Sequence, residues 1–310
     1  MQVKEIRRET PRWRRRLAND WQLYLLVLPA VIYVIIFNYM PMYGVQIAFK
    51  DFSTKKGIWA SQWVGLKHFI RFVNFPNFWK IIRNTLSITC YSLLVSFPIP
   101  IIFALLLNEL DNVPFKKTVQ MISYAPHFIS TVVICSMLTL FMDRNNGIFN
   151  HIIAALGGKR NDWLSVPGYF ADIYVWSGVW QGTGWGTIIY LAALAGVPEE
   201  LHEAAYIDGA SRFQIVTKIN LPIIAPTIII MLIMRFGSIM NIGFEKIYLL
   251  QNSLNLDTSQ VIATYEYQVG VRNGQFSYSS AISLFNTVIN ITLLLIVNYI
   301  SKRVAEISLL

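Results

Sequence analysis

Six apolar stretches, each long enough to cross a membrane as a helix, dominate the sequence. A transmembrane helix needs about 20 mostly apolar residues. Prolines lie inside several of the stretches, including Pro98, Pro126 and Pro226, and a proline in a spanning helix frees backbone carbonyls that neighbouring helices must satisfy. The pattern therefore predicts an all-α integral membrane protein whose six transmembrane helices pack as one bundle. The six windows are roughly 22–40, 83–107, 119–142, 171–195, 223–250 and 279–300.

The charge distribution agrees with a membrane setting and argues against nucleic acid. Only 14% of the 310 residues are charged, whereas a soluble domain carries about 25%. The net charge of +9 is concentrated at the N-terminus, directly before the first apolar stretch. Such a cluster is typical of a cytoplasmic anchor that faces anionic lipid. Its members are Lys4, Arg7, Arg8, Arg12, Arg14, Arg15 and Arg16.

The basic N-terminus also sets the predicted topology. With residues 1–21 in the cytoplasm and six spans across residues 22–300, the tail at 301–310 lies in the cytoplasm as well. The 196–222 connection between the fourth and fifth spans then faces the cytoplasm. The longer 41–82 connection faces outward, and its Trp59–Phe72 part suits a helix at the headgroup interface. That part is either an aromatic belt or a docking surface for an outside protein.

The 196–222 connection contains signals for two short helices joined by a glycine. Pro198, Glu199 and Glu200 favour a helix start, and Gly209 can end that helix in a left-handed turn. A second helix is predicted from about Ser211, ended by Leu221-Pro222. On these signals alone the loop is either a capped connector or a surface that another protein binds.

The same loop carries a spaced motif: Glu203-Ala204-Ala205, three residues, Gly209, nine residues, then Ile219-Asn220-Leu221-Pro222. This resembles the EAA signature of the membrane subunits of type I ATP-binding-cassette (ABC) importers. Further stretches resemble the polysaccharide-type sugar permeases, which are related to the maltose and alginate importer permeases. These are PMYG (41–44), AFKDF (48–52), WVGL (63–66), NTL (84–86), PHFIS (126–130), GWG (184–186) and YLAALAGV (190–197).

The resemblance implies a fold, a function and a set of partners. It implies the type I ABC importer permease fold and a non-catalytic permease subunit of an ATP-driven, binding-protein-dependent oligosaccharide importer in the bacterial cell membrane. The implied partners are a second, homologous permease, two cytoplasmic ABC ATPases and an extracellular or periplasmic sugar-binding protein. The EAA loop is then the coupling helix that seats in an ATPase cleft. Its implied coupling residues are Glu203, Ala204, Ala205, Asp208, Gly209, Ile219, Leu221 and Pro222.

The chain itself has no phosphate-binding loop of the form GxxxxGK[ST]. ATP and magnesium are therefore expected on the ATPase subunits, and we expect this chain to bind no cofactor and no metal. A membrane enzyme is the main alternative, but none of the four histidines has the spacing of a two-histidine metal helix. A secondary transporter is another, although the sequence lacks the repeated halves typical of that class. The histidines are His68, His127, His151 and His202.

Polar residues inside the predicted spans suggest where a substrate passes. In the fifth span, four of them follow a helical spacing that places them on one face. Polar residues in spans usually face a cavity or a partner helix, so these are either pathway residues or hydrogen-bonding contacts between helices. Aromatic rings also stack on sugars, so Trp185 is a further candidate for the substrate pathway. The full set is Trp185, Ser238, Asn241, Glu245, Tyr248, Asn286 and Asn290.

Overall fold

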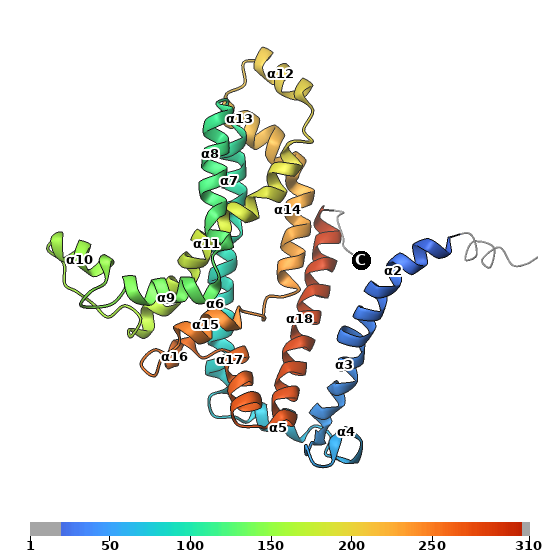
Figure 1. Ribbon diagram of the computed structural model, residues 1–310. Helices are drawn as coiled ribbons and strands as arrows, with labels where there is room; N and C mark the ends of the chain where they lie inside the picture. The colour runs from blue at the N-terminus through green and yellow to red at the C-terminus, as the bar shows by residue number, and fades with distance from the viewer. Residues whose placement is uncertain (1–19, 306–310) are drawn as a thin grey trace, which may run out of the picture.

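The computed structural model describes residues 20–305, and these are almost entirely helical (Figure 1). The basic N-terminal cluster and the last five residues lie outside the described part. Between residues 20 and 305 the one strand pair is short and antiparallel, with Lys50 opposite Trp63. Its strands are β1 (Lys50–Asp51) and β2 (Gln62–Trp63).

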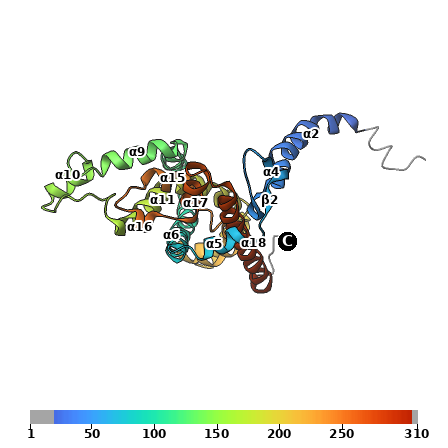
Figure 2. The same ribbon diagram turned by 90° about the horizontal axis from the view of Figure 1, so that it is seen from below.

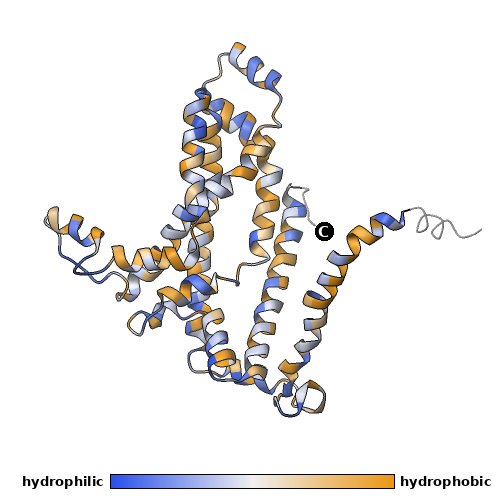
Figure 3. Cartoon of the chain, viewed as in Figure 1, coloured by the Kyte–Doolittle hydropathy of each residue, from blue (hydrophilic) through white to orange (hydrophobic). Residues whose placement is uncertain are grey.

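The first apolar stretch forms a single rod that leans away from the other helices (Figures 1 and 2). None of the residues of α2 (Trp21–Val34) is buried, and most of the helix beyond its first turn is apolar (Figure 3). A helix that is apolar all round needs lipid or another protein around it. The rod continues through η1 (Ile35–Tyr39), α3 (Met40–Met42) and η2 (Tyr43–Phe49).

The other long helices form a bundle around α11 (Phe170–Leu194), which packs against α6, α7, α8 and α14. At Gly184 the backbones of α11 and α8 come so close that a Cβ would lie 2.1 Å from the Ser123 carbonyl oxygen. A glycine is therefore required at this crossing. The bundle helices are α6 (Phe78–Ser96), α7 (Pro98–Asn108), α8 (Val113–Tyr124), α11, α14 (Leu221–Phe236) and α18 (Phe276–Ala305).

The third predicted span, 119–142, is wrong as a straight helix. α8 and η3 (Ala125–Phe128) meet α9 (Thr131–Phe141) at a bend of 96°. Ile129 and Ser130 are extended, and Ser130 Oγ accepts a hydrogen bond from the Val133 N–H, which starts a new helix. The chain then makes an arm with α10 (Ile148–Ala155) and η4 (Pro167–Tyr169).

The fifth predicted span, 223–250, is also wrong as a continuous helix. α14 ends at Phe236, residues 237–243 are not helical, and the next helix, α15, covers only Phe244–Leu250. Ser238 and Asn241 therefore do not share a helical face with residues of α15. The chain returns through α16 (Leu256–Ser259), α17 (Ile262–Tyr267) and η6 (Gln268–Arg272) before α18.

Four helical rods of the described chain have the length and composition to cross a membrane, or five if the bent pair counts as one span. α11 has 25 residues but is not among them. Its Gly, Gln and Trp residues make it less apolar than the others. The four rods are Trp21–Phe49, Phe78–Asn108, Arg212–Phe236 and Phe276–Arg303.

The 41–82 connection, predicted to face outward, does not hold the single interfacial helix predicted for Trp59–Phe72. It folds into α4 (Gly57–Ala60), β2 and α5 (Lys67–Val73). Phe72 is 1% exposed and packs edge-on against the Phe78 and Phe285 rings, which anchors the connection to the bundle. Trp59 remains exposed, so only part of the segment is available to an interface.

Candidate functional site

The loop with the spaced motif forms an elbow at one end of the bundle (Figure 1). α12 (Glu199–Ile207) begins after Pro198, and Gly209 follows with φ = +76°. That left-handed backbone suits glycine because a Cβ would be strained there. α13 (Arg212–Ile215) then starts with a capping box between Ser211 and Gln214. The predicted order of helix, glycine turn and helix is confirmed.

The predicted end of the second helix at Leu221-Pro222 is wrong. After α13 the helix widens into η5 (Val216–Asn220), a π-helix, and runs directly into α14. A proline inside a helix has no N–H to donate to the preceding turn and its ring crowds that turn. A wider turn just before Pro222 accommodates this, so the elbow is joined rigidly to the next long helix.

The outer surface of the elbow is uncovered within the described chain. α12 has no buried residue. Ile207 is 87% and Phe213 is 76% exposed, one on each side of Gly209. The Glu203 carboxylate forms no ion pair with a residue in 20–305. Exposed large apolar side chains grouped with an unpaired charge are typical of a protein interaction site.

The inner side of the elbow is held by one fully buried residue, Asn220. Its Oδ1 lies 2.7 Å from Nε2 of His202 on α12, and its Nδ2 donates to Glu109 Oε1 at 3.4 Å. Asn220 occupies the one unassigned position of the Ile219-x-Leu221-Pro222 element. Residue-by-residue matching to the motif therefore missed it, and a polar residue between apolar ones was the only signal in the sequence.

A second contact ties the elbow to the segment after α7. Arg212 donates to the Glu109 carbonyl oxygen at 3.3 Å and to Asp111 Oδ2 at 3.0 Å. The Asp111 carboxylate, which accepts this hydrogen bond, raises the pKa of the Arg212 guanidinium, so Arg212 stays charged. The elbow is thereby connected to both α14 and the end of α7.

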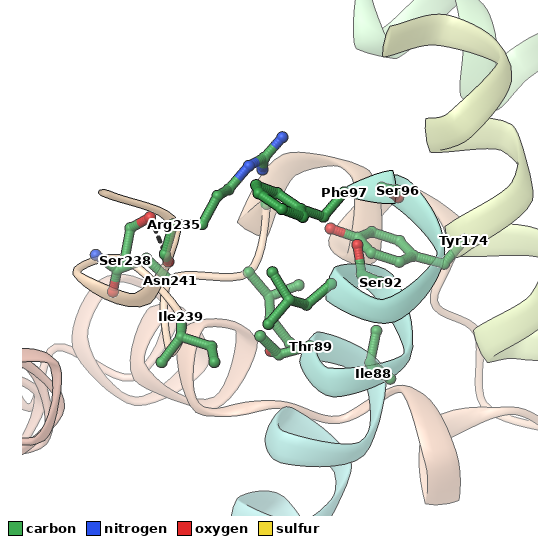
Figure 4. Close-up of a pocket in the computed structure, with 13 residues that line it drawn as sticks. Ile88, Thr89, Ser92, Ser96, Phe97, Tyr174, Arg235, Ser238, Ile239 and Asn241 are labelled. Atoms are coloured by element: carbon green, nitrogen blue, oxygen red, sulfur yellow. Dashed lines mark hydrogen bonds between the residues drawn. The ribbon is translucent and has the colours of Figure 1, made fainter. Parts of the chain in front are cut away.

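A polar cavity lies where α14 stops, about 140 Å³ in volume. α6 contributes Thr89, Ser92 and Ser96, and α11 contributes Tyr174. Figure 4 shows Arg235 reaching over this space from the end of α14, with the Tyr174 hydroxyl pointing into it. Ser238 and Asn241, both predicted from the sequence, line the cavity as well.

The break in α14 is stabilised by α18. Asn286 and Asn290 each donate from Nδ2 to Asn241 Oδ1, at 2.9 and 3.1 Å. Asn290 Oδ1 accepts from the Met240 N–H at 2.9 Å. In these contacts Asn286 and Asn290 join α18 to the non-helical stretch 237–243, and they do not line the cavity.

The remaining predicted residues lie elsewhere. Tyr248 packs against Phe244 and Tyr267 in an aromatic cluster. Glu245 is exposed on α15. Trp185 is 47% exposed and stacks on the His127 ring at 4.4 Å. The structure thus brings Ser238 and Asn241 to the cavity and separates these three from it.

A lysine absent from the predicted set lines an adjoining cavity of about 230 Å³. This is Lys246, which is 8% exposed and donates to the Tyr174 carbonyl oxygen at 3.1 Å. A charged residue in an apolar stretch was the available signal. Between residues 20 and 305, no group of three or more His, Cys, Asp or Glu side chains is arranged to hold a metal ion.

Comparisons with known proteins agree with this architecture. Residues 77–306 match the family model described as "Binding-protein-dependent transport system inner membrane component". Protein LplB of Bacillus subtilis is 44% identical over 94% of this chain and 92% of its own length. YteP of Bacillus subtilis, named a polygalacturonan/rhamnogalacturonan transport system permease protein, is 40% identical over 94% of this chain and 91% of its own length.

A solved structure shows the same fold. A chain from the crystal structure of a bacterial ABC transporter involved in the import of the acidic polysaccharide alginate superposes with a TM-score of 0.89 and 37% identity. It covers 95% of this chain and 100% of its own length. The predicted resemblance is confirmed, as is the prediction of a transport subunit in place of a membrane enzyme. The chain is a multi-pass helical protein of the inner membrane and belongs to the family of binding-protein-dependent transport system inner membrane components.

Proposed function

We propose that this chain forms one half of the translocation pathway of an ATP-driven oligosaccharide importer. The observation that carries the proposal is the elbow with its motif, because its outer surface is uncovered in the described chain and its inner side is tied to η5 and to the segment after α7. The substrate class rests on relatives, whose names refer to trehalose/maltose, arabinooligosaccharides and polygalacturonan/rhamnogalacturonan.

The proposed partners are a second permease, two cytoplasmic ATPases and an outside sugar-binding protein. The family description itself refers to a binding protein. One similar solved structure is a bacterial alginate ABC transporter in complex with an alginate pentasaccharide-bound periplasmic protein. A second permease would close the pathway from the other side. The apolar α2 rod, uncovered within residues 20–305, offers further surface to lipid or to that subunit.

In the proposed topology the six-span domain covers residues 22–300, with α11 as the span that is less apolar than the rest. Both termini, 1–21 and 301–310, and the 196–222 loop face the cytoplasm. A thiol label on a cysteine at position 302 should react only from the cytoplasmic side, and one at position 159 only from outside. Cys90 is exposed and must be replaced by serine first. Reaction at position 159 from the cytoplasm would refute six spans.

In the proposed coupling step, α12 seats in a cleft of an ATPase subunit. Glu203 pairs with a cation of that subunit, Ala204 and Ala205 allow close approach, and Ile207 and Phe213 supply apolar contact. Asp208 and Gly209 set the bend. Ile219, Leu221 and Pro222 join the elbow to α14, so that closure of the ATPases moves the helix that borders the cavity.

In the proposed pathway, sugar hydroxyls meet the hydroxyl and amide groups around the break in α14. Ser238 and Asn241 line this space together with Ser92 and Ser96. Binding sites of this kind combine a few placed polar groups with apolar and aromatic walls. For Trp185, Glu245, Tyr248, Asn286 and Asn290 contact with substrate stays a prediction.

The test is reconstitution of the whole importer in liposomes, with ATP hydrolysis and uptake measured for oligosaccharides presented by the binding protein. Wild type should hydrolyse ATP faster when a transported oligosaccharide is present. Ile207→Ser and Phe213→Ser should lower ATPase association and uptake. Leu156→Ser, which changes a residue 83% exposed beyond α10, should not. Full association in both elbow variants would contradict the coupling role.

A further inference from the structure

Two cations face the cavities at the break in α14, and no acid faces them. Arg235 lines both cavities and Lys246 lines the larger one. The two cavities share Ser92, Ser96, Tyr174 and Arg235, so they lie side by side. Neither lining contains an aspartate or glutamate. Within residues 20–305, neither Arg235 nor Lys246 forms an ion pair.

Lys246 is held in place with donors to spare. Its ammonium donates one hydrogen bond, to the Tyr174 carbonyl oxygen at 3.1 Å, and lies 5.2 Å from the Tyr174 ring centroid. A Cβ placed on Gly178 would lie 3.5 Å from the same nitrogen, so α11 passes close beside it. A lysine has three donors. The Lys246 ammonium is therefore buried and held by α11, and it uses only one of its three donors in the described chain.

Arg235 is placed differently. It projects from the last turn of α14 over the cavity (Figure 4), and its guanidinium forms no ion pair with a carboxylate of residues 20–305. A guanidinium presents a planar fork of donors that matches the two oxygens of a carboxylate. Charged groups among membrane helices are costly and usually mark a functional site. A neutral sugar would leave both cations without a counter-charge.

We propose that Arg235 and Lys246 select carboxylate-bearing oligosaccharides, that is, chains containing uronic acid residues. This inference rests on the proposed function and narrows its substrate class. Arg235 binds a sugar carboxylate through its fork, and Lys246 provides the second positive charge in the adjoining cavity, which Arg235 also lines. The serine hydroxyls of α6 serve the neutral parts of the sugar ring.

The test compares one oligosaccharide with and without its charge. The complete importer, in lipid nanodiscs and without binding protein, is titrated with trigalacturonate and with fully methyl-esterified trigalacturonate. Wild type should bind the acid at least about tenfold more tightly than the ester, as expected when charge-assisted hydrogen bonds form. Arg235→Gln and Lys246→Met should each remove about tenfold or more of the affinity for the acid and leave that for the ester unchanged.

Two control variants test whether the preference for the acid depends on the cations at this site or on the positive charge of the protein in general. Arg235→Lys keeps the charge without the fork and should retain part of the preference. Lys302→Gln removes an exposed cation at the end of α18 and should change nothing. Because Arg235 is exposed, its variants test the inference even if Lys246→Met does not assemble.

Equal binding of acid and ester by wild type, no binding of either, or an unchanged preference in Arg235→Gln would overturn the inference. The proposed function is scored separately, by ATP-driven uptake of oligosaccharides loaded on the binding protein. If only neutral oligosaccharides are taken up, the proposed importer function is supported and the proposed carboxylate selectivity is wrong. No uptake of any oligosaccharide would count against both.

Discussion

Asn290 accepts a 2.9 Å hydrogen bond from the backbone N–H of Met240, and this contact closes the gap left where α14 stops. Both residues are buried, Asn290 at 5% and Met240 at 2% exposure. A non-helical backbone among membrane helices is tolerated only when its polar groups find partners in the protein. The break that shapes the cavity therefore depends on a side chain of α18.

Replacement of Asn290 by alanine should destabilise the assembled importer by about 1–3 kcal/mol, because the Met240 N–H would be buried without a partner. The loss should affect all substrates alike and show as a lower unfolding temperature. Thr287→Ala is the matched control, since Thr287 is exposed on the same helix and donates to the Ser283 carbonyl of its own helix. Unchanged stability with altered substrate preference would make Asn290 a pathway residue.

Asn241→Ala should have two separable effects. It removes the acceptor shared by Asn286 and Asn290, and it removes an amide from the cavity lining. Asn286→Ala removes only one of the two hydrogen bonds and leaves Asn241 in place. After correction for the amount of assembled complex, only Asn241→Ala should weaken apparent substrate affinity, by about tenfold for one lost hydrogen-bonding group. Equal transport kinetics in the two variants would assign Asn241 to helix packing alone.

The sequence predicted the helical class and the elbow well because both depend on local signals. A long run of apolar residues predicts a helix without reference to the rest of the chain. Pro198 and Gly209 likewise act on their immediate neighbours, and they begin α12 and follow its end as predicted. It failed at the two broken spans. Apolar composition across 223–250 does not reveal that Asn290, some fifty residues further on, can satisfy an open backbone at Met240. Long-range hydrogen bonds of this kind decide where a spanning helix stops.

The same reasoning explains the candidate site. The helical spacing grouped Ser238 with Asn241, and both do line the cavity, but they lie within the non-helical stretch 237–243, so the predicted face does not continue to Tyr248 on α15. Lys246 lies near the end of the predicted fifth span, where a lysine can also reach the membrane interface. Only the packing of α15 against α11 shows that it lines a cavity.

Gly209→Val should uncouple ATP hydrolysis from transport. Gly209 has φ = +76°, where a β-branched residue is strained, so the elbow should reorganise at a cost of about 1 kcal/mol or more. The permease pair should still assemble while uptake per ATP hydrolysed falls. Gly168→Ala is the control, since its Cβ would meet no atom within 4 Å and its backbone is not left-handed. Normal uptake in Gly209→Val would show that the left-handed turn is dispensable.

Asn220→Leu tests whether the buried inner side of the elbow transmits movement. Leucine has the same number of side-chain heavy atoms and the same branching as asparagine but cannot hydrogen-bond to His202 or Glu109, so α12 would lose its polar link to η5 and to the segment after α7. Two polar groups would be left unpaired at a partly buried site, at a cost of about 1–3 kcal/mol. Because the outer face of α12 is unchanged, ATPase subunits should still bind. We expect uptake per ATP hydrolysed to fall several-fold with ATPase association intact, measured in the same liposomes.

Thr118→Val is the control. Thr118 lies on the exposed side of α8 near this end of the bundle, and its hydroxyl bonds only within its own helix, so both readouts should stay unchanged. A loss of ATPase binding in parallel with uptake would instead mean that Asn220 maintains the docking surface, and an unaffected ratio would mean that α14 alone carries the movement.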